Sequence, residues 1–295
     1  MMDTGATGHG FETKSDFLKF RRFIEFYCKK FKEDSLLSSA AVKEDHKKFV
    51  FRYYEKIFVQ PDQLYSRHFK WFARLQPIMR GLPRGSTILD YGAGYGMDSI
   101  YLAYCGYKVV FYEISPDHVN IFSALRAAWE QEMGPIAIDP VLANPERDES
   151  LPPVDAIMMD EVAHHIEPTE DLFQRCARLL PPGGKLFLLE PNALNPLVQA
   201  YFFRVRGFKT VVQHVDERTG KTYLHGNEHI RLRGGWNRLA LQAGLRPGPW
   251  HPIIPYFMDS AEALESPLRR RLASTPGLRS LLASHMTYEY IKPAA

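Results

Sequence analysis

The sequence contains few cysteines and no long apolar run. Its three cysteines, Cys28, Cys105 and Cys176, lie far apart along the 295-residue chain. This spacing supports neither a disulfide framework nor a zinc cluster, as is usual for proteins of a reducing compartment. The N-terminus lacks the apolar segment of a secretory signal, and no stretch reaches the roughly 18 apolar residues of a membrane span. We therefore expect a cytoplasmic protein with no membrane partner.

The chain also lacks a strong excess of either charge. Its formal net charge is only +3, whereas a nucleic-acid-binding surface normally gives a domain a clear basic excess. We therefore expect a small-molecule partner and no nucleic acid. With 45% hydrophobic residues, the chain can bury a full core, as one large domain or as a domain with a cap. The sequence leaves the oligomeric state open between a monomer and a homodimer.

Three glycines alternate with other residues at the end of an apolar segment. Asp90 ends this segment, and Gly92, Gly94 and Gly96 follow it before a helical pattern begins at Met97. Alternate glycines let the backbone turn sharply and let a ligand approach closely. Between a strand and a helix, such a turn forms a nucleotide-type pocket at the carboxyl edge of a parallel sheet. No Gly-Lys-Ser/Thr follows, and Met97 stands where a dinucleotide motif needs its third glycine, so both of those common motifs are excluded.

An acidic residue follows the glycines at an informative distance. A short helix over 99–103 ends at Gly106, and a second apolar strand over 108–112 ends at Glu113. A carboxylate about 20 residues after the first glycine, at the tip of the second strand, is suited to hold the hydroxyls of a ribose. The alternative is a tight turn followed by a surface glutamate. The combination of strand, turn, helix, strand and acid favours the ribose site.

The run from Asp90 to Gly96, followed by Glu113, resembles the first two motifs of class I S-adenosylmethionine-dependent methyltransferases. The resemblance implies an α/β fold with a Rossmann-like, seven-stranded, mostly parallel sheet, helices on both faces, and S-adenosylmethionine as cofactor. It is closest to the small-molecule branch of the family. The further matching segments are 135–139 with the third strand, 154–160 with the fourth, 161–166 with the Val-Leu-x-His segment after it, 179–190 with the Pro-Gly-Gly turn and fifth strand, and 235–245 with the helix before the sixth.

The resemblance also implies roles for residues at this edge of the sheet. Tyr91 either flanks the sulfonium by a cation–π contact or packs beneath the turn. Glu113 can accept hydrogen bonds from both ribose hydroxyls, because an ionised carboxylate has several acceptor sites. The remaining cofactor residues that we expect are Asp90 with the backbone of Gly92, Ala93, Gly94 and Gly96 at the amino-acid moiety, Asp139 at the adenine amino group, Ile114 at the adenine face, and Asp160 at the end of the fourth strand.

Two regions flank the alternating strands and helices. Residues 16–80 carry apolar side chains at helical spacing, so residues 1–80 are predicted to form a helical N-terminal cap, with boundaries at Pro61 and Pro77. These side chains either pack as core or also form an apolar wall over the ligand. Residues 81–295 form the predicted methyltransferase domain, with a basic insertion at about 197–233 that resembles a substrate lid. The C-terminal elements that we expect are a strand over 250–256, a helix over 261–273 and a strand over 286–291.

Candidate catalytic residues follow the predicted fourth strand. Methyl transfer requires alignment of nucleophile, methyl and sulfur, and positioning alone can supply up to roughly 7–11 kcal/mol. A base is needed only if the acceptor atom must lose a proton. Glu161, His164 and His165 are the candidates, since a histidine titrates near neutral pH. In the alternative interpretation, His165 holds the loop structurally. The candidate substrate contacts on the insertion are His225, His229 and Arg231, unless these belong to a solvated face.

We expect no metal site, because consecutive histidines on a turn usually point apart and no Cys/His spacing supports zinc. The predicted function is a methyltransferase acting on the oxygen, nitrogen or carbon of a small, partly apolar metabolite, with a biosynthetic role. The alternatives are an NAD(P)-dependent oxidoreductase and a non-catalytic binding module of the same fold. The segment after the fourth strand reads Asp-Glu-Val-Ala over 160–163, not the Asn/Asp-Pro-Pro-Tyr/Phe of enzymes that methylate amino groups of nucleic acids.

Overall fold

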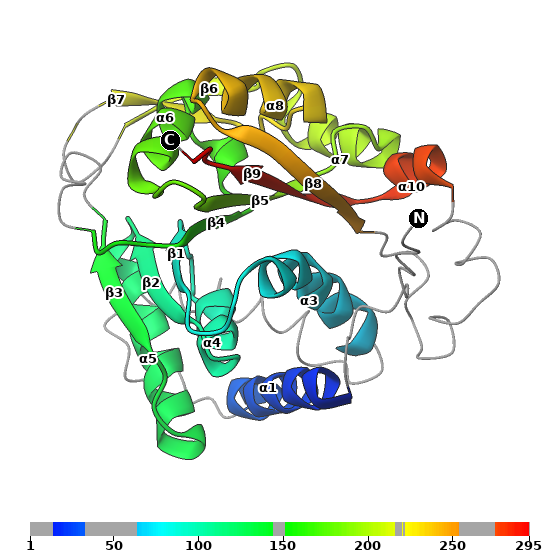
Figure 1. Ribbon diagram of the computed structural model, residues 1–295. Helices are drawn as coiled ribbons and strands as arrows, with labels where there is room; N and C mark the ends of the chain where they lie inside the picture. Colours follow the sequence, from blue (N-terminus) through cyan, green and yellow to red (C-terminus); the bar gives the residue numbers. More distant parts are fainter. Residues whose placement is uncertain are drawn as a thin grey trace, which may run out of the picture.

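A computed structural model describes residues 14–32, 64–143, 151–215, 220, 222–253 and 275–294. Its centre is a seven-stranded sheet in the order β3-β2-β1-β4-β5-β9-β8 (Figure 1). The hairpin β6–β7 forms a separate sheet of two strands. The strands of the main sheet are β1 (Thr87–Tyr91), β2 (Lys108–Glu113), β3 (Ile138–Leu142), β4 (Ala156–Asp160), β5 (Lys185–Pro191), β8 (Arg246–Ile253) and β9 (His285–Ile291).

Strands β1 to β5 run parallel, and β9 lies antiparallel between β5 and β8. The strand order reverses between β1 and β4, so the carboxyl ends of these two strands form a topological switch point, where open α/β sheets bind ligands. The residues of β4 and β5 are almost all buried, as expected of central strands covered on both faces. The predicted Rossmann-like, mostly parallel sheet is confirmed.

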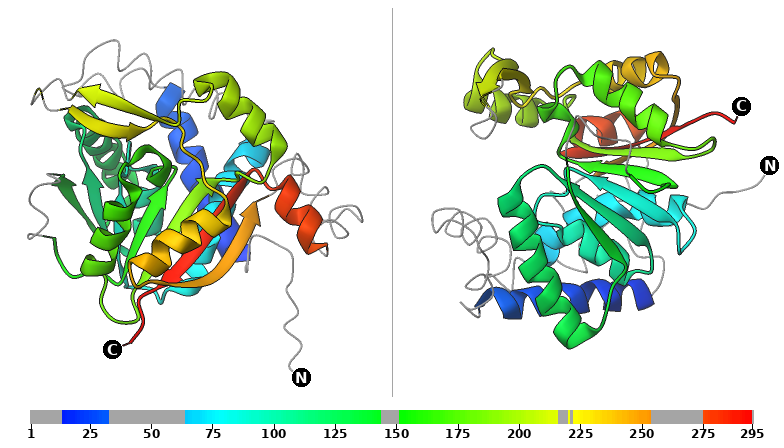
Figure 2. Two further views of the ribbon diagram at one scale, coloured as in Figure 1. Left: turned by 90° about the horizontal axis from the view of Figure 1, so that it is seen from above. Right: turned by 90° about the vertical axis from the view of Figure 1, so that its left-hand side faces the viewer.

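Helices cover both faces of the sheet (Figures 1 and 2). One face carries the side chains of α1, α3, α4 and α5, and the other carries those of α6 and α8. Further elements are a one-turn 3-10 helix, η3, directly after β4, and the short helix α10 before β9. Their bounds are α1 (Lys14–Lys32), α3 (Leu64–Gly81), α4 (Met97–Tyr104), α5 (Pro116–Met133), η3 (Ala163–His165), α6 (Thr169–Leu179), α8 (Arg233–Gln242) and α10 (Pro276–Leu282).

The N-terminal helices are part of the core. On α1, Phe23 packs against Tyr101 of α4 and Trp129 of α5, with ring centroids 5.0 and 5.5 Å apart. The core interpretation of this stretch is therefore confirmed for α1, while residues 33–63 lie outside the described part. Pro77 lies inside α3 and is buried, so the expected boundary there is wrong. The helix continues through the proline, and its neighbours Gln76 and Ile78 are also buried.

Three predicted strand boundaries differ from the structure. The third strand begins at Ile138, where pairing with Val109 of β2 starts, and not at residue 135. The fourth begins two residues later than expected, at Ala156, and β8 begins earlier, at Arg246. Residues 254–256 and the helix expected over 261–273 lie outside the described residues. In β3 and β8, buried and exposed residues do not alternate regularly, so periodicity in the sequence gives a weak signal there.

The predicted insertion contains helix α7 (Pro196–Arg206) and the strands β6 (Val211–Val215) and β7 (Thr222–Gly226). It lies on the side of the sheet that carries α6 and α8 (Figures 1 and 2). An isolated bridge between Ile166 and His225 connects the hairpin to the segment just after η3. The insertion therefore reaches the chain that leaves the central strand β4. Among the helices that the structure describes, none combines the length and apolarity of a membrane span.

Candidate active site

The glycine turn after β1 rests on the end of β2. The backbone N–H of Gly92 donates to the carbonyl of Tyr112 at 2.8 Å. The N–H of Gly94 donates to Oε2 of Glu113, also at 2.8 Å. Gly94 has a φ of +57°, and a Cβ built on it would meet no atom within 4 Å. The turn thus presents open space above Gly94, where a ligand can approach the backbone.

Gly96 is required for a different reason. Its φ is +73°, and a Cβ there would lie 2.9 Å from the ring of Phe111 and would also collide with Phe122. A left-handed conformation costs a non-glycine residue about 1–2 kcal/mol, and overpacking adds about 1–3 kcal/mol. We therefore expect Gly96→Ala to lower the free energy of unfolding by about 2–5 kcal/mol in urea denaturation.

Gly94→Ala is the matched control for this prediction, because Gly94 has a similar φ but open space around it. The free energy of unfolding of Gly94→Ala should fall only by the conformational cost, about 1–2 kcal/mol. Equal losses in the two variants would show that the close packing of α4 against Phe111 and Phe122 does not require glycine.

Glu113 is an ionised acceptor at the end of β2. Its side chain is buried, and its Oε1 accepts hydrogen bonds from the backbone N–H of Ile114 at 2.8 Å and of Ser115 at 2.9 Å. Burial alone would raise the pKa of Glu113, but His118 and the backbone N–H groups of Ser115 and Gly94 outweigh it and hold the pKa below its usual value. The carboxylate therefore stays charged beside the glycine turn, as a ribose acceptor must.

Exposed apolar side chains adjoin this carboxylate. Ile114 is 59% exposed, and Leu142, which pairs with Glu113 in the sheet, is 54% exposed. The expected adenine contact Asp139 does not lie with them. Asp139 pairs with Val110, three residues before the end of β3. The predicted adenine contact of Asp139 is therefore wrong, because this residue does not lie at the carboxyl end of the strand. The strand starts three residues later than the sequence suggested, which moves its carboxyl end past Asp139.

Asp90 is buried beneath the turn. Ser99 Oγ donates to its Oδ2 at 2.6 Å. Burial, followed by the negative charge of Asp98, raises the pKa of Asp90 to about 8. Near neutral pH this carboxyl therefore holds its proton until a positive charge arrives beside it.

Tyr91 packs beneath the turn. Arg175 Nη1 donates to its hydroxyl at 2.8 Å, and its ring centroid lies 4.9 Å from that of Tyr112. The side chain is buried in the core on the face of α6. The packing interpretation is confirmed, and the expected contact of the Tyr91 ring with a sulfonium is wrong.

A cluster that the sequence did not predict lies at the end of β4. Arg74 of α3 places Nη1 2.9 Å from Oδ1 of Asp160. Asp98, at the start of α4, accepts a hydrogen bond from the Trp71 indole and shares another with Asp160. Burial raises the pKa of Asp160 well above its usual value although Arg74 opposes the rise, and Asp98 adds to it. Burial also raises the pKa of Asp98, so both carboxyls of this pair are harder to ionise than in water.

Glu161 begins the turn after β4 with a φ of +57°. Its Oε1 lies 2.7 Å from Arg74 Nη1 and 2.6 Å from Nε2 of His285. Non-glycine residues in this conformation are strained and concentrate at functional sites. The side chain of Glu161 is already engaged by two basic groups, so its arrangement favours holding the turn over the predicted role as a base.

His164 is buried between two carboxylates that the sequence analysis did not assign to the site. Its Nδ1 lies 2.6 Å from Oε2 of Glu190, and its Nε2 lies 3.4 Å from Oε2 of Glu228. Burial alone would lower the pKa of His164, but the carboxylates outweigh it and raise the pKa to about 10. The expected titration near neutral pH is therefore wrong for His164, and a protonated imidazole cannot accept a proton.

His165 has the opposite electrostatics. Its Nδ1 lies 3.1 Å from the carbonyl oxygen of Gly226. Because a carbonyl only accepts, Nδ1 carries the hydrogen and Nε2 keeps a lone pair. Burial, together with neighbouring His164, lowers the pKa of His165 below its usual value. Of the predicted candidates, His165 therefore has the arrangement of a neutral base.

The insertion residues divide into two groups. His225 stacks on His165, with ring centroids 5.3 Å apart and planes 9° from parallel. His229 Nδ1 and Arg231 Nη2 instead both lie 2.6 Å from Oε1 of Glu167. The structure therefore brings His225 to the site, while His229 and Arg231 hold the loop before α8 to the chain after η3. The predicted substrate contacts of His229 and Arg231 are not supported by this arrangement.

Comparison with known proteins agrees with this geometry. A family model described as a methyltransferase domain matches residues 62–246, which is more than half of the chain. The protein therefore belongs to the methyltransferase-domain family, and it is a class I S-adenosylmethionine-dependent methyltransferase. Since the family model covers the glycine turn and Glu113, the alternatives of a nicotinamide-dependent oxidoreductase and a non-catalytic module are set aside.

Individual relatives are more distant. The chain is 29% identical over 183 residues to a ubiquinone biosynthesis O-methyltransferase of Xylella fastidiosa strain 9a5c, covering 60% of this chain and 71% of that protein. It is 33% identical over 108 residues to the protein of the same name from Caulobacter vibrioides, covering 37% of this chain and 42% of that protein. A solved SAM-dependent methyltransferase from Methanosarcina mazei shares the fold, with a TM-score of 0.51, 15% identity, and coverage of 74% and 98% of the two chains.

Proposed function

We propose that the protein transfers a methyl group from S-adenosylmethionine to a hydroxyl oxygen of a small, partly apolar acceptor in a biosynthetic reaction. The observation that carries the proposal is the arrangement at three strand ends. The glycine turn follows β1, ionised Glu113 ends β2, and neutral His165 follows β4. The names of the O-methyltransferase relatives support oxygen as the acceptor atom and biosynthesis as the setting.

The residues at the cofactor end fit S-adenosylmethionine. Open space above Gly94 admits the ligand to the backbone, and Glu113 can accept the ribose hydroxyls. Ile114 and Leu142 offer exposed apolar surface for an adenine beside that carboxylate. Asp90, buried beneath the turn, supplies a negative charge for an ammonium group when it ionises. When bound, the cofactor supplies a methyl group activated by a sulfonium.

The acceptor end requires a group that takes a proton from a hydroxyl as its oxygen attacks. The lone pair on His165 Nε2 meets this requirement, whereas His164 is protonated. Phe202 of α7 lies with its ring centroid 6.5 Å from that of His164 and contributes an apolar side to the same region. A planar hydroxyl compound, such as a phenol or catechol, matches a site with stacked imidazoles and an aromatic neighbour.

A direct assay tests the acceptor class. Purified protein is incubated with S-adenosylmethionine and a panel of phenols, catechols and matched aromatic amines, and S-adenosylhomocysteine release is measured with product mass. We expect methyl ethers from hydroxyl compounds and no product from the amines. Turnover confined to amines would contradict an oxygen acceptor.

The cofactor assignment predicts a loss of binding in Glu113→Ala. Removing a buried acceptor of charge-assisted hydrogen bonds should cost about 1–3 kcal/mol of cofactor binding, or about 5- to 150-fold in affinity. Titration calorimetry with S-adenosylhomocysteine measures it. Glu132→Ala is the matched control, since Glu132 pairs with Lys29 and Lys30 on α1, away from the turn. Unchanged affinity in Glu113→Ala, or binding of NAD in its place, would reject the assignment.

A further inference from the structure

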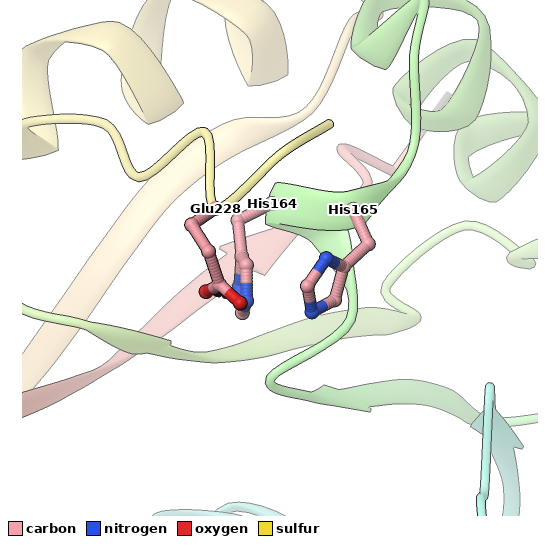
Figure 3. A group of neighbouring side chains, drawn as sticks. All are labelled: His164, His165 and Glu228. Carbon is pink, nitrogen blue, oxygen red and sulfur yellow. Dashed lines mark ion pairs between the residues drawn. The ribbon is translucent and has the colours of Figure 1, made fainter. Parts of the chain in front are cut away.

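Two histidines and a carboxylate converge beside the acceptor end. His164 and His165 come from η3, and Glu228 comes from the loop after β7 (Figure 3). One potential ligand atom from each residue lies within 4.8 Å of the other two. The expectation that consecutive histidines point apart is wrong here, because their ring centroids are only 4.1 Å apart. Figure 3 shows the three side chains next to one another.

In both imidazoles Nδ1 is bonded to an acceptor outside the cluster, so Nε2 is the nitrogen that can bind a metal. Nδ1 of His164 is bonded to the carboxylate of Glu190, and Nδ1 of His165 is bonded to the carbonyl of Gly226. Metal-binding histidines almost always donate their other ring N–H to a carboxylate or a backbone carbonyl, which fixes the ring orientation. Both of these arrangements are present, one on each histidine, and each leaves Nε2 as the ligand atom.

The distances suit a small divalent cation. With metal–ligand bonds of about 2.0–2.2 Å, two ligands of a tetrahedral site lie about 3.4 Å apart. Nε2 of His164 and Oε2 of Glu228 are 3.4 Å apart. The remaining separations are at most 4.8 Å, so they must shorten by up to about 1.4 Å to reach tetrahedral spacing. A small change in the χ angles of half-exposed His165 or Glu228 provides this shift.

The backbone holds the carboxylate of Glu228 in this place. Glu228 has a φ of +54°, and the N–H of the next residue, His229, donates to the carbonyl of His164 at 3.1 Å. Gly226 lies so close to the carbonyl of His164 that a Cβ would collide with it. The end of the hairpin is thereby fastened to η3 at several points. A site assembled from two distant segments is in this way held with fixed geometry.

We propose that Nε2 of His164, Nε2 of His165 and the carboxylate of Glu228 bind one divalent transition-metal ion of the zinc type. Two imidazoles and one carboxylate form a typical ligand set for such ions, and they leave coordination positions open. The rival arrangement is a metal-free cluster in which the His164 ring bridges the two carboxylates, with Nδ1 facing Glu190 and Nε2 facing Glu228.

The ion also extends the proposed function, on which this part of the inference rests. An open coordination position would take the hydroxyl oxygen of the acceptor and make its proton leave more easily, with solvent as the proton acceptor. His165 then acts on the acceptor through the ion, whereas in the metal-free chain its Nε2 takes the proton directly. Glu190 is a positioning residue, since it touches His164 and not the ion.

Metal binding is tested without cofactor or acceptor. The full chain is treated with chelator, dialysed and titrated with Zn²⁺ in a calorimeter. We expect one ion per chain, at least about tenfold weaker binding in Glu228→Gln and His165→Gln, and about 10- to 100-fold weaker binding in Glu190→Gln. His214→Gln is the matched control, because His214 lies on the same hairpin outside the cluster, and it should bind as the unaltered chain does.

Circular dichroism and melting temperature confirm that each variant is folded before it is titrated. Mg²⁺ at the same concentration should not displace the Zn²⁺, because imidazole ligands favour zinc. The proposal is overturned if the unaltered chain takes up no Zn²⁺, if Glu228→Gln binds it equally well, or if His214→Gln loses binding to the same extent.

The metal site and the proposed function fail in different ways. Zn²⁺ binding that depends on Glu228, without methylation of any hydroxyl acceptor, would keep the site and reject the function. Full methylation in the presence of chelator, by a chain that binds no Zn²⁺, would reject the site and keep the function.

Discussion

Replacement of His165 by Gln lowers kcat for methylation of a hydroxyl acceptor by about 10²- to 10⁴-fold, the usual contribution of a positioned base. The affinity for S-adenosylhomocysteine stays unchanged, because the cofactor residues lie at the ends of β1 and β2. Both proposed routes, direct proton acceptance and activation through a bound ion, use the lone pair on His165 Nε2. The loss is therefore expected in the protein as purified and in the Zn²⁺-loaded protein.

The pH profile gives a second readout for His165. Its pKa lies below the usual 6.5, so the imidazole is neutral at pH 7 and loses its lone pair only as the pH falls through that lower value. In the chelator-treated protein we expect kcat to be flat near neutral pH and to fall on the acid side, while the residual rate of His165→Gln lacks this acid limb. His214→Gln is the matched control. A variant at position 165 that keeps full turnover would place the proton acceptor elsewhere.

Asp90→Asn stabilises the metal-free and cofactor-free protein at pH 8. Asp90 is fully buried, and its pKa rises from 3.8 to about 8. A raised pKa means that the folded chain keeps a proton that the unfolded chain releases. The stability that neutral Asp90 contributes is therefore complete below pH 3.8 and is lost as the pH rises towards 8. Asparagine has no proton to lose and still offers an oxygen to Ser99.

The expected gain is about 5 kcal/mol at pH 8 and vanishes near pH 4. Urea denaturation at pH 4, 6 and 8 measures it, with Asp139→Asn at an exposed position of β3 as the control. The same variant should bind S-adenosylmethionine more weakly, since it lacks the charge for an ammonium group. A stability difference that does not vary with pH would contradict the assignment of the raised pKa to Asp90.

The cofactor end could be predicted from the sequence because it is local. Asp90, the glycines and Glu113 lie within 24 residues, and the positive φ of Gly92, Gly94 and Gly96 favours glycine at those three positions. Asp139 was misplaced because the edge strand β3 has no regular alternation of buried and exposed residues, so its register could not be read from periodicity.

The acceptor end depends on contacts between distant segments. Arg74 reaches Asp160 across 86 residues, and Glu228 reaches His164 across 64. A single sequence carries no signal for such pairs. Glu190, a lone acid at the end of an apolar strand, offered a weak signal, and the consecutive histidines were recognised without their partners.

Because Glu228 is attached to η3 through the end of the hairpin, changes in the hairpin offer a route to new acceptor specificities in this chain. The proposed cofactor residues lie at the ends of β1 and β2 in the main sheet. Glu228, the carboxylate proposed to face the acceptor, lies in an insertion outside that sheet. Exchange of residues 207–230 for the matching loop of another methyltransferase would alter the reaction partner and leave the methyl source intact. The insertion can therefore be exchanged as a unit, while the turn that carries His164 and His165 stays in place.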